Sequence, residues 1–414
     1  MTTSTLPVEA ITNPLTFTDP AALHGLLARI RKEDPLPYIE AEDYAPFWLV
    51  SRHSDILEVE RNAANFINAP RQALMPLSYE AKMREMAGGL ETKDFMRNLV
   101  LMDGAEHKAY RDLAQAYFTP KGLEGIIKDI EVLAGEFIGR MADKEGEVDF
   151  AELAMAFPLR VVMTMLGVPA SDEPMMLRLT QQTLSSQDPE FASEGGARAA
   201  MMQMFTYFKK MIDELRVTPN DTLASIIANA RVNGELLRDP DVFGYFNIVA
   251  TAGHDTTSYA ITGGLLALLQ NPGELARLRA DPSLMPLAVE EILRWTTSVK
   301  HFCRTAVNDC VVAGKQVKAG DVMLISYPSG SFDEAIYEDP FTFRIDRKPN
   351  RHLAFGTGPH VCLGQYLARF ELSSFFRTLL DRVEHMELAG TPRFVEGSFV
   401  GGVKYLPIRY RLRG

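Results

Sequence analysis

Cysteine is scarce in this chain, with three among 414 residues: Cys303, Cys310 and Cys362. So small and odd a number argues against a disulfide framework. It also cannot supply the four thiolates of an iron–sulfur cluster. Residues 1–7 lack the basic segment followed by an apolar segment that marks a secretory signal. Together these absences predict a protein of the reducing cytoplasm.

Net positive charge and uninterrupted apolar runs are missing as well. The 54 acidic and 43 basic side chains leave a net charge of −11, which argues against nucleic acid as a partner. The one long apolar stretch, 243–269, contains His254 and Asp255. These residues would be costly in lipid, so we expect a buried core helix and no membrane span. Repeats and low-complexity linkers are absent too, and we expect residues 1–414 to form a single, monomeric domain.

What the chain does have is a series of amphipathic helical segments, which predicts a mainly α fold with small β-sheets. Asp19 and Pro20 are typical of a helix start, and this first helix is expected to reach about Lys32. The other predicted helices are 106–118, 122–142, 149–167, 174–186, 196–216, 221–232, 239–270, 273–280 and 284–296. The predicted strands are 36–40 and 47–50 as a hairpin, 305–312, 322–326, and a hairpin within 399–412. Residues 67–103 indicate a mobile loop region or a set of short helices.

Cys362 lies in the most informative segment, the glycine-punctuated decapeptide 355–364, directly ahead of a helix-forming run. Gly356 and Gly358 allow a positive φ or a close backbone approach. A thiol at a helix N-terminus is expected to have a lowered pKa and to accept backbone N–H donors, which suits an axial iron ligand. The alternative is a buried structural cysteine beside a glycine-rich turn.

The spacing Phe-Gly-x-Gly-x-His-x-Cys-x-Gly at 355–364 resembles the haem-binding signature of the cytochrome P450 monooxygenases. The resemblance implies the fold of that family, with haem b (iron protoporphyrin IX) between a long central helix and the Cys-bearing loop and helix. It implies that Cys362 ligates the iron, that Phe355 shields the sulfur from water, and that Gly364 belongs to the cofactor-binding loop.

A second motif lies in the central helix, at residues 252–258. Ala252 and Thr256 share a helix face and leave room beside a flat cofactor. Gly253 weakens the helix, so a local distortion is expected there. By resemblance to the family's oxygen-activation motif, Thr256 would hydrogen-bond the bound oxygen and Asp255 would deliver protons. The alternative is a self-satisfied Thr256 and an Asp255 that pairs with an outside cation. We expect His254 to be a packing or surface residue.

Haem carries two propionates, which need cations or hydrogen-bond donors at its edge. Residues at positions that serve this purpose in the family are His107, Arg111, Arg304 and His360. Each of them alone could be an ordinary surface or capping residue.

Glu291 and Arg294 are three apart on a predicted helix and resemble the family's Glu-x-x-Arg pair. In the family this pair is buried and anchors the thiolate loop, so a structural role is expected. The third member of the network is open, because Thr342 occupies its usual position and Arg344 or Arg347 could replace it.

The resemblance spans nearly the whole chain and is closest to soluble bacterial members that hydroxylate monoterpenes such as α-terpineol. It implies insertion of one atom of dioxygen into a C–H bond of a small apolar substrate, a terpenoid or an aromatic hydrocarbon. Apolar residues at the expected pocket positions are Val249, Ala252, Val299, Phe302 and Val400. Plain core packing would use the same residues. The segments 67–103 and 169–200 set the pocket size and show no readable pattern, so the substrate stays open.

Electrons are expected from separate proteins, a ferredoxin and its ferredoxin reductase. Basic residues near the thiolate loop could form the docking patch, and we name Lys108, Arg347, Lys348 and Arg351. A steroid-type hydroxylase remains an alternative. So do a peroxide-driven haem enzyme and a non-catalytic haem-binding protein, although neither of these two needs the pair Asp255 and Thr256.

Overall fold

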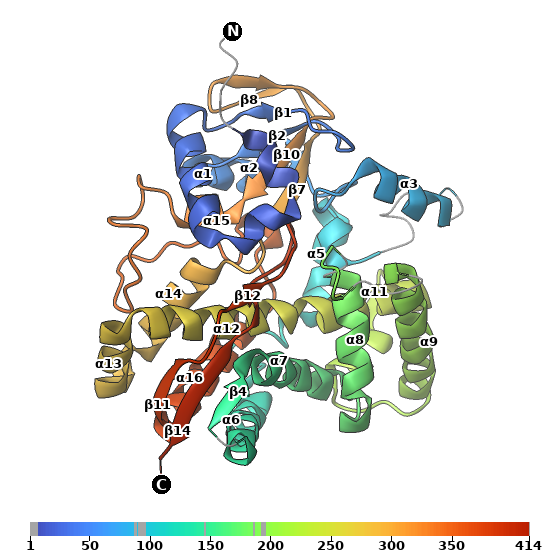
Figure 1. Ribbon diagram of the computed structural model, residues 1–414. Coiled ribbons are helices and arrows are strands. Elements are labelled where there is room, and N and C mark those ends of the chain that lie inside the picture. Colours follow the sequence, from blue (N-terminus) through green and yellow to red (C-terminus); the bar gives the residue numbers. More distant parts are fainter. Residues whose placement is uncertain are drawn as a thin grey trace.

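The computed structural model describes residues 7–86, 89, 97–144, 146–184, 187–191 and 196–413. Helices make up most of the molecule (Figure 1). The α-helices are α1 (Pro20–Glu33), α2 (His53–Arg61), α3 (Leu77–Met86), α5 (Gly104–Gln115), α6 (Glu124–Gly139), α7 (Phe150–Leu166), α8 (Glu173–Leu184), α9 (Gly196–Val217), α10 (Leu223–Ala228), α11 (Asp239–Ala252), α12 (Asp255–Gln270), α13 (Pro272–Ala280), α14 (Met285–Thr296), α15 (Tyr327–Ser331) and α16 (Gln365–Arg382). Short 3-10 turns are η1 (Val8–Thr12), η2 (Pro14–Thr18), η3 (Leu99–Leu101), η4 (Arg140–Asp143), η5 (Ala170–Asp172), η6 (Pro282–Leu284) and η7 (Gly358–His360).

The strands form small sheets at the sides of the helical body. They are β1 (Tyr38–Ile39), β2 (Phe47–Val50), β3 (Phe66–Ile67), β4 (Glu147–Asp149), β5 (Arg231–Val232), β6 (Glu235–Leu236), β7 (His301–Ala306), β8 (Cys310–Val312), β9 (Lys315–Val317), β10 (Val322–Ser326), β11 (Val383–Leu388), β12 (Arg393–Phe394), β13 (Val403–Tyr405) and β14 (Pro407–Leu412). The largest sheet has the order β1-β2-β10-β7-β3, in which only β2 and β10 are parallel. A second sheet has the order β11-β14-β4.

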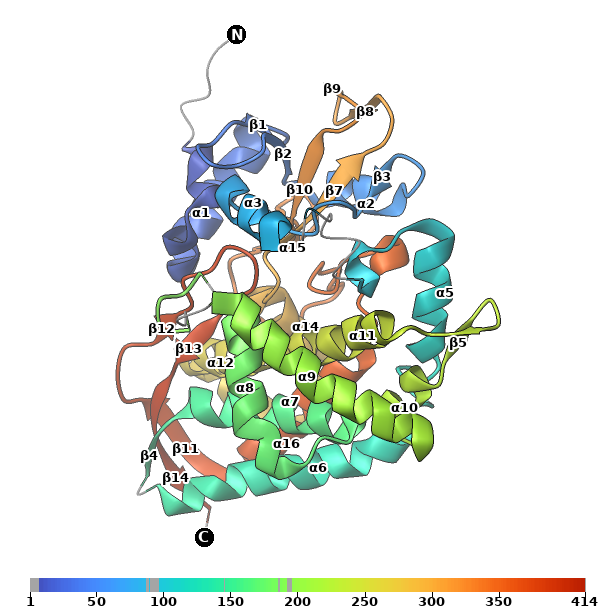
Figure 2. The ribbon, with the colours of Figure 1, turned by 90° about the vertical axis from the view of Figure 1, so that its right-hand side faces the viewer.

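Helix α12 crosses the middle of the molecule, with α7 and α16 close beside it (Figures 1 and 2). Most of its residues are buried, the polar Asp255, Ser258 and Thr262 included, so helix packing surrounds it on nearly every side. Gly264 permits close packing on two other helices. A Cβ at this position would lie 2.7 Å from Ile292 of α14 and 3.0 Å from Phe376 of α16. This packing places the central helix against the helix that follows Cys362.

Most of the predicted elements are confirmed. The first helix, the hairpin of β1 and β2, the helices near 106–118, 149–167 and 196–216, and strand 322–326 lie where the patterns place them. The described part of 67–103 contains the short helices α3 and η3, while residues 87–88 and 90–96 lie outside the described residues. None of the described helices is long and apolar enough to span a bilayer.

Four predictions of extent were wrong. The helix expected over 221–232 ends at Ala228, and the chain then turns at Asn233 and Gly234, both with positive φ, in the hairpin of β5 and β6. The strand expected over 305–312 is two strands. Residues 399–412 do not form a hairpin, since β13 pairs with β12 and β14 pairs with β11. The helix expected over 239–270 is divided into α11 and α12.

Candidate active site

The loop before Cys362 is closed by its own backbone. The Cys362 N–H donates to the Phe355 carbonyl at 2.9 Å. Gly356 and Gly358 have φ of 62° and 70°, as expected for this loop. A Cβ on Gly358 would lie 2.3 Å from the backbone oxygen of Glu60. The positive φ favours glycine at both positions, and the close approach to Glu60 requires it at 358; the loop holds Cys362 just before α16.

The Cys362 thiol is exposed, although protein surrounds it closely enough that burial is the largest influence on its pKa. A side chain that borders an internal space can be exposed to that space and still be enclosed by protein. Burial raises the thiol pKa, against the opposing effects of the Gly364 N–H and of the charges of Arg111 and Arg369. Our expectation of a lowered pKa was therefore wrong for the free thiol. The Phe355 ring lies 4.6 Å beneath the Arg369 guanidinium.

Helix α5 brings two of the expected rim residues to this loop. The Arg111 guanidinium donates to the Val361 carbonyl at 2.8 Å, and the rings of His107 and His360 lie 4.0 Å apart. His360 in turn lies 3.6 Å from the Asp103 carboxylate. Burial, with the nearby charges of His360 and Arg111, lowers the pKa of His107 to about 4, so its ring is neutral. Its Nε2 is buried without a hydrogen-bond partner among the described residues.

Arg304, another residue expected to bind a haem propionate, is already engaged by protein partners. It is buried, and its guanidinium donates to Glu60 at 2.5 Å and to the Cys303 carbonyl at 2.9 Å. Glu60 also accepts from the Tyr327 hydroxyl at 2.7 Å and from the Thr357 N–H at 3.0 Å. Burial raises the pKa of Glu60 in spite of these donors. Sequence reasoning missed Glu60, because no motif marks it and its partners are far along the chain.

The central helix breaks where Gly253 predicts a distortion. Helix α11 ends at Ala252 and α12 begins at Asp255, with His254 between them at φ −108°. The Thr256 hydroxyl donates to the Ala252 carbonyl at 2.9 Å, and the Ser298 hydroxyl donates to the Thr256 carbonyl at 2.8 Å. Ala252 is exposed and Thr256 is half-buried, although both lie on the central helices. This face therefore borders open space.

Asp255 points into protein and not toward that space. It is fully buried, and one carboxylate oxygen lies 2.9 Å from Nε2 of His254. His254 is also fully buried, with Nδ1 2.9 Å from the Ala250 carbonyl and Nε2 3.2 Å from the Thr180 hydroxyl. Against the effect of burial, the Asp255 charge and the hydrogen bonds to Asp255 and to the Ala250 carbonyl raise the pKa of His254. A packing role for His254 is thus confirmed and a surface position is wrong. Asp255 pairs inside the protein.

A second buried acid lies beside the break and was missed by the sequence reasoning. Glu371 of α16 is fully buried, and neither carboxyl oxygen has a partner of good geometry among the described residues. Burial raises its pKa well above the ordinary value, and the Thr257 hydroxyl opposes that shift. Glu371 is therefore a neutral acid between α16 and α12. A glutamate within a helix gives no signal of this in the sequence.

The five expected pocket residues come from two sides of the molecule. Val249 and Ala252 lie in the last turn of α11. Val299 and Val400 face each other in an antiparallel bridge, and the Phe302 ring packs 5.4 Å from that of Phe399. Val400 is buried and the other apolar side chains are partly exposed or exposed.

The open question on Glu291 and Arg294 is answered by Arg347. Both glutamate oxygens accept from Arg294 at 2.7 Å, and the Arg347 guanidinium lies 3.1 Å from each. Arg344 contributes its backbone N–H at 3.0 Å, and Asn350 donates at 3.1 Å. All the donors that a buried carboxylate needs are present, which agrees with the expected structural role.

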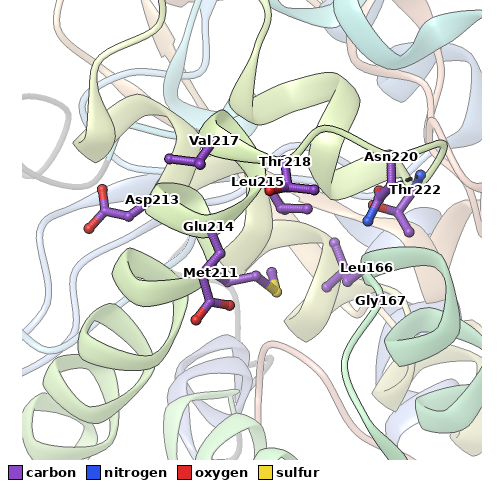
Figure 3. A pocket seen from close by; sticks show the side chains of 10 residues that line it. All are labelled: Leu166, Gly167, Met211, Asp213, Glu214, Leu215, Val217, Thr218, Asn220 and Thr222. Atoms are coloured by element: carbon purple, nitrogen blue, oxygen red, sulfur yellow. Dashed lines mark hydrogen bonds between the residues drawn. The ribbon is translucent and has the colours of Figure 1, made fainter.

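A pocket of about 590 Å³ lies elsewhere, where the ends of α7 and α9 meet the start of α10 (Figure 3). Its side chains include the carboxylates of Asp213 and Glu214 and none of the residues described above. It therefore adds nothing to the Cys362 site.

The family model described as "Cytochrome P450" matches residues 78–400. The chain is 37% identical to "Cytochrome P450-terp" of a Pseudomonas species, over 96% of this chain and 95% of that protein. It is 32% identical to a "Steroid C26-monooxygenase" of Mycolicibacterium smegmatis, over 93% and 90%. The crystal structure of CYP108D1 from Novosphingobium aromaticivorans superposes with a TM-score of 0.91 at 39% identity, with 99% of each chain covered. The chain belongs to the cytochrome P450 family, and it is an oxidoreductase, a haem b monooxygenase.

The described residues fit haem. The Cys362 thiol is accessible from an internal space, and the buried, unpartnered Nε2 of His107 is a ready donor for a propionate. Arg111 and His360 lie next to it. Arg304 keeps only part of its guanidinium for the cofactor, since Glu60 takes one nitrogen and the Cys303 carbonyl takes another.

Proposed function

We propose that this monooxygenase hydroxylates a C–H bond of a small apolar substrate, a terpenoid or an aromatic hydrocarbon, with electrons from a ferredoxin. The observation that carries the proposal is the open face of the broken central helix, where Ala252 and Thr256 are accessible within the protein interior. The relatives support a small apolar substrate. One is named P450-terp, and a cytochrome P450 from Mycobacterium marinum, 28% identical, was solved with pseudoionone.

The residues of the Cys362 site would have different roles in binding haem. Cys362 would ligate the haem iron, while His107, Arg111, His360 and part of Arg304 would hold the propionates. Phe355 and Gly364 would complete the proximal loop. Bound haem supplies iron-centred activation of dioxygen.

Proton supply would come from the broken helix. The Thr256 hydroxyl now donates to the Ala252 carbonyl, and it must rotate away from that carbonyl to reach an oxygen atom in the open space. Asp255 would deliver protons only after its carboxylate leaves His254, because it is fully buried in the present pairing. Asp255 and Thr256 would then act in sequence, the acid through the alcohol.

Substrate would lie against the apolar residues on both sides of this space. Val249 and Ala252 would form one wall, and Val299, Phe302 and Val400 the other. These side chains offer no charge, so shape and apolar area would decide the choice of substrate. A steroid would be accepted if the space extends further, and the steroid C26-monooxygenase relatives make this the second candidate.

Electron transfer would use basic residues near the Cys362 loop. Lys348, Arg351 and Lys108 are exposed and remain candidates for ferredoxin docking. Arg347 does not, because it is buried on Glu291. Replacing Arg351 and Lys108 by Glu should slow reduction by the ferredoxin, whereas Lys318→Glu, at an exposed position beyond β9, should not. Equal rates in all variants would remove this docking patch.

The reaction is proposed for the cytoplasm, with residues 1–414 acting as one catalytic unit. The three cysteines are free, and free thiols would persist in such a reducing compartment.

A panel of terpenoids, alkylbenzenes and steroids tests the proposal. Binding in the open space should shift the haem from low spin to high spin, and turnover with ferredoxin and its reductase should give a hydroxylated product. Binding by steroids alone would favour the second candidate. Turnover with peroxide that equals turnover with the reductase partners would contradict the ferredoxin-dependent reaction.

A further inference from the structure

A second cavity, of about 720 Å³, lies between α1, the C-terminal half of α12 and the segment 392–403. The haem-site residues Cys362, Thr256 and His107 do not line it. It borders the same extended segment as the expected substrate wall. Val299 and Val400 form an isolated β-bridge, and the residue that follows each of them, Lys300 and Gly401, lines this cavity.

Aromatic rings form much of the lining. The ring of Phe332 lies 3.8 Å from that of His24 and 5.5 Å from that of Trp295, and Phe341 continues the cluster at 5.9 Å. The volume lies within the range of about 300–1,000 Å³ typical of small-molecule sites. A compact apolar or aromatic body fits such a lining.

One cation borders this apolar space without an acidic partner. The Lys300 Nζ donates to the carbonyls of Thr296 and Thr297, at 3.0 and 2.9 Å, at the end of α14. No carboxylate pairs with it among the described residues. Burial lowers its pKa to about 8. Among the described residues that line the cavity, the only acid is Asp19, which is exposed and caps α1 through the Ala22 N–H.

His24 adds a neutral polar group to the lining. Burial, together with the charges of Lys300, Arg31 and Arg294, lowers its pKa to about 3. Its Nδ1 is buried without a partner in the part of the chain that the structure describes. The surroundings of this imidazole are thus positive, with the other cations already paired to Glu334 and Glu291.

We propose that this cavity is a second binding site, for a small molecule with a carboxylate on a compact apolar or aromatic body. The carboxylate would pair with the Lys300 ammonium, and the body would pack on Trp295, Phe332 and Phe341. A helix-capping role alone accounts for two of the three Nζ protons. It leaves a charge facing an apolar cavity, which is costly unless an anion compensates it.

Gly25 of α1 provides a way to close the cavity. It lines the space, and a Cβ added there would meet nothing within 4 Å. Gly25→Phe therefore adds a ring at the exposed rim of the cavity, at a position with room for it. It also removes a helix-interior glycine, which favours folding.

The test is calorimetric titration of the holoenzyme, with the haem chamber occupied by 4-phenylimidazole on the iron. The probe is 4-tert-butylbenzoate, and its neutral match is 4-tert-butylbenzamide. We expect saturable binding of the carboxylate, and binding about ten- to a hundredfold weaker for the amide, as loss of a charge-assisted hydrogen bond implies. Lys300→Met should weaken binding of the carboxylate by the same factor and leave the affinity for the amide unchanged. Lys318→Met, which removes a surface lysine, should change the affinity for neither probe.

Gly25→Phe should weaken binding of both probes, because its ring narrows the rim of the cavity, while the haem spectrum stays that of the wild type. This variant also decides the matter if Lys300→Met does not fold. The proposal is overturned if the wild type does not bind the carboxylate saturably. It is equally overturned if Gly25→Phe binds it as the wild type does, or if a folded Lys300→Met does so.

Discussion

Two buried glutamates on neighbouring helices have opposite surroundings. Glu291 of α14 accepts from two guanidiniums, a backbone N–H and an amide, so both its oxygens are fully used. Glu371 of α16 is equally buried, but neither of its oxygens has a partner of good geometry among the described residues. The first glutamate is a charged structural centre, and the second is an acid that keeps its proton.

This difference in surroundings suits Glu291 to a structural role and Glu371 to a chemical one. The network around Glu291 joins α14 to the segment before the Cys362 loop through Arg347 and Asn350. Its saturation leaves no group free to exchange a proton. Glu371, beside Thr257, is an unsaturated acid next to the break in the central helix, and Asp255 at the break has only the contact with His254. Unsatisfied buried groups of this kind are typical of functional sites.

Glu291→Gln should have the largest effect. The amide leaves two buried guanidiniums without a counter-charge, so we expect a loss of about 3–5 kcal/mol in the free energy of unfolding. Guanidinium chloride titration with the haem spectrum as the signal measures it. A loss below about 1 kcal/mol would show that the network is not needed to hold the loop.

Glu290→Gln, at the adjacent position, is the matched control. Glu290 binds Arg369 at 2.6 Å and His352 at 3.0 Å, but a quarter of its side chain is exposed. We expect a smaller loss, about 1–2 kcal/mol. These partners lower its pKa to about 2, so its contribution is present above the unfolded pKa near 4.3 and is lost as the pH falls toward 2. The difference between wild type and variant should shrink over that window. A constant difference would contradict the assignment.

Glu371→Gln should cause the smallest loss of stability of the three. The carboxyl is already neutral, so the amide changes the free energy of unfolding by less than about 1 kcal/mol at low pH. Because burial raises the pKa of Glu371, its stabilising contribution is present below the unfolded pKa and is lost as the pH rises. Wild type should therefore lose stability relative to the variant above about pH 4.5, by up to about 1.4 kcal/mol per pH unit. The opposite slope would mean that Glu371 is ionised.

The sequence predicted those features that depend on residues close together in the chain. The glycines of the Cys362 loop, the Asp19 cap of α1 and the weak point at Gly253 each act on neighbouring residues. It did not predict contacts between residues that are far apart in the chain and are brought together by packing. Glu60 meets Arg304 across 244 positions, and nothing near either residue announces the pair. The missed hairpin at Asn233 and Gly234 is a different case, since that dipeptide is itself a turn signal that the helical pattern obscured.

The central claim is that the broken central helix supplies protons through Thr256. The most direct test is the amount of product formed per pair of electrons consumed, in wild type and in Thr256→Ala. The matched control is Thr251→Ala, which removes a hydroxyl with the same bond to a carbonyl four residues earlier, at a buried position of α11. We predict that Thr256→Ala continues to consume electrons but yields much less product, while Thr251→Ala stays coupled. Unchanged coupling in Thr256→Ala would contradict the account.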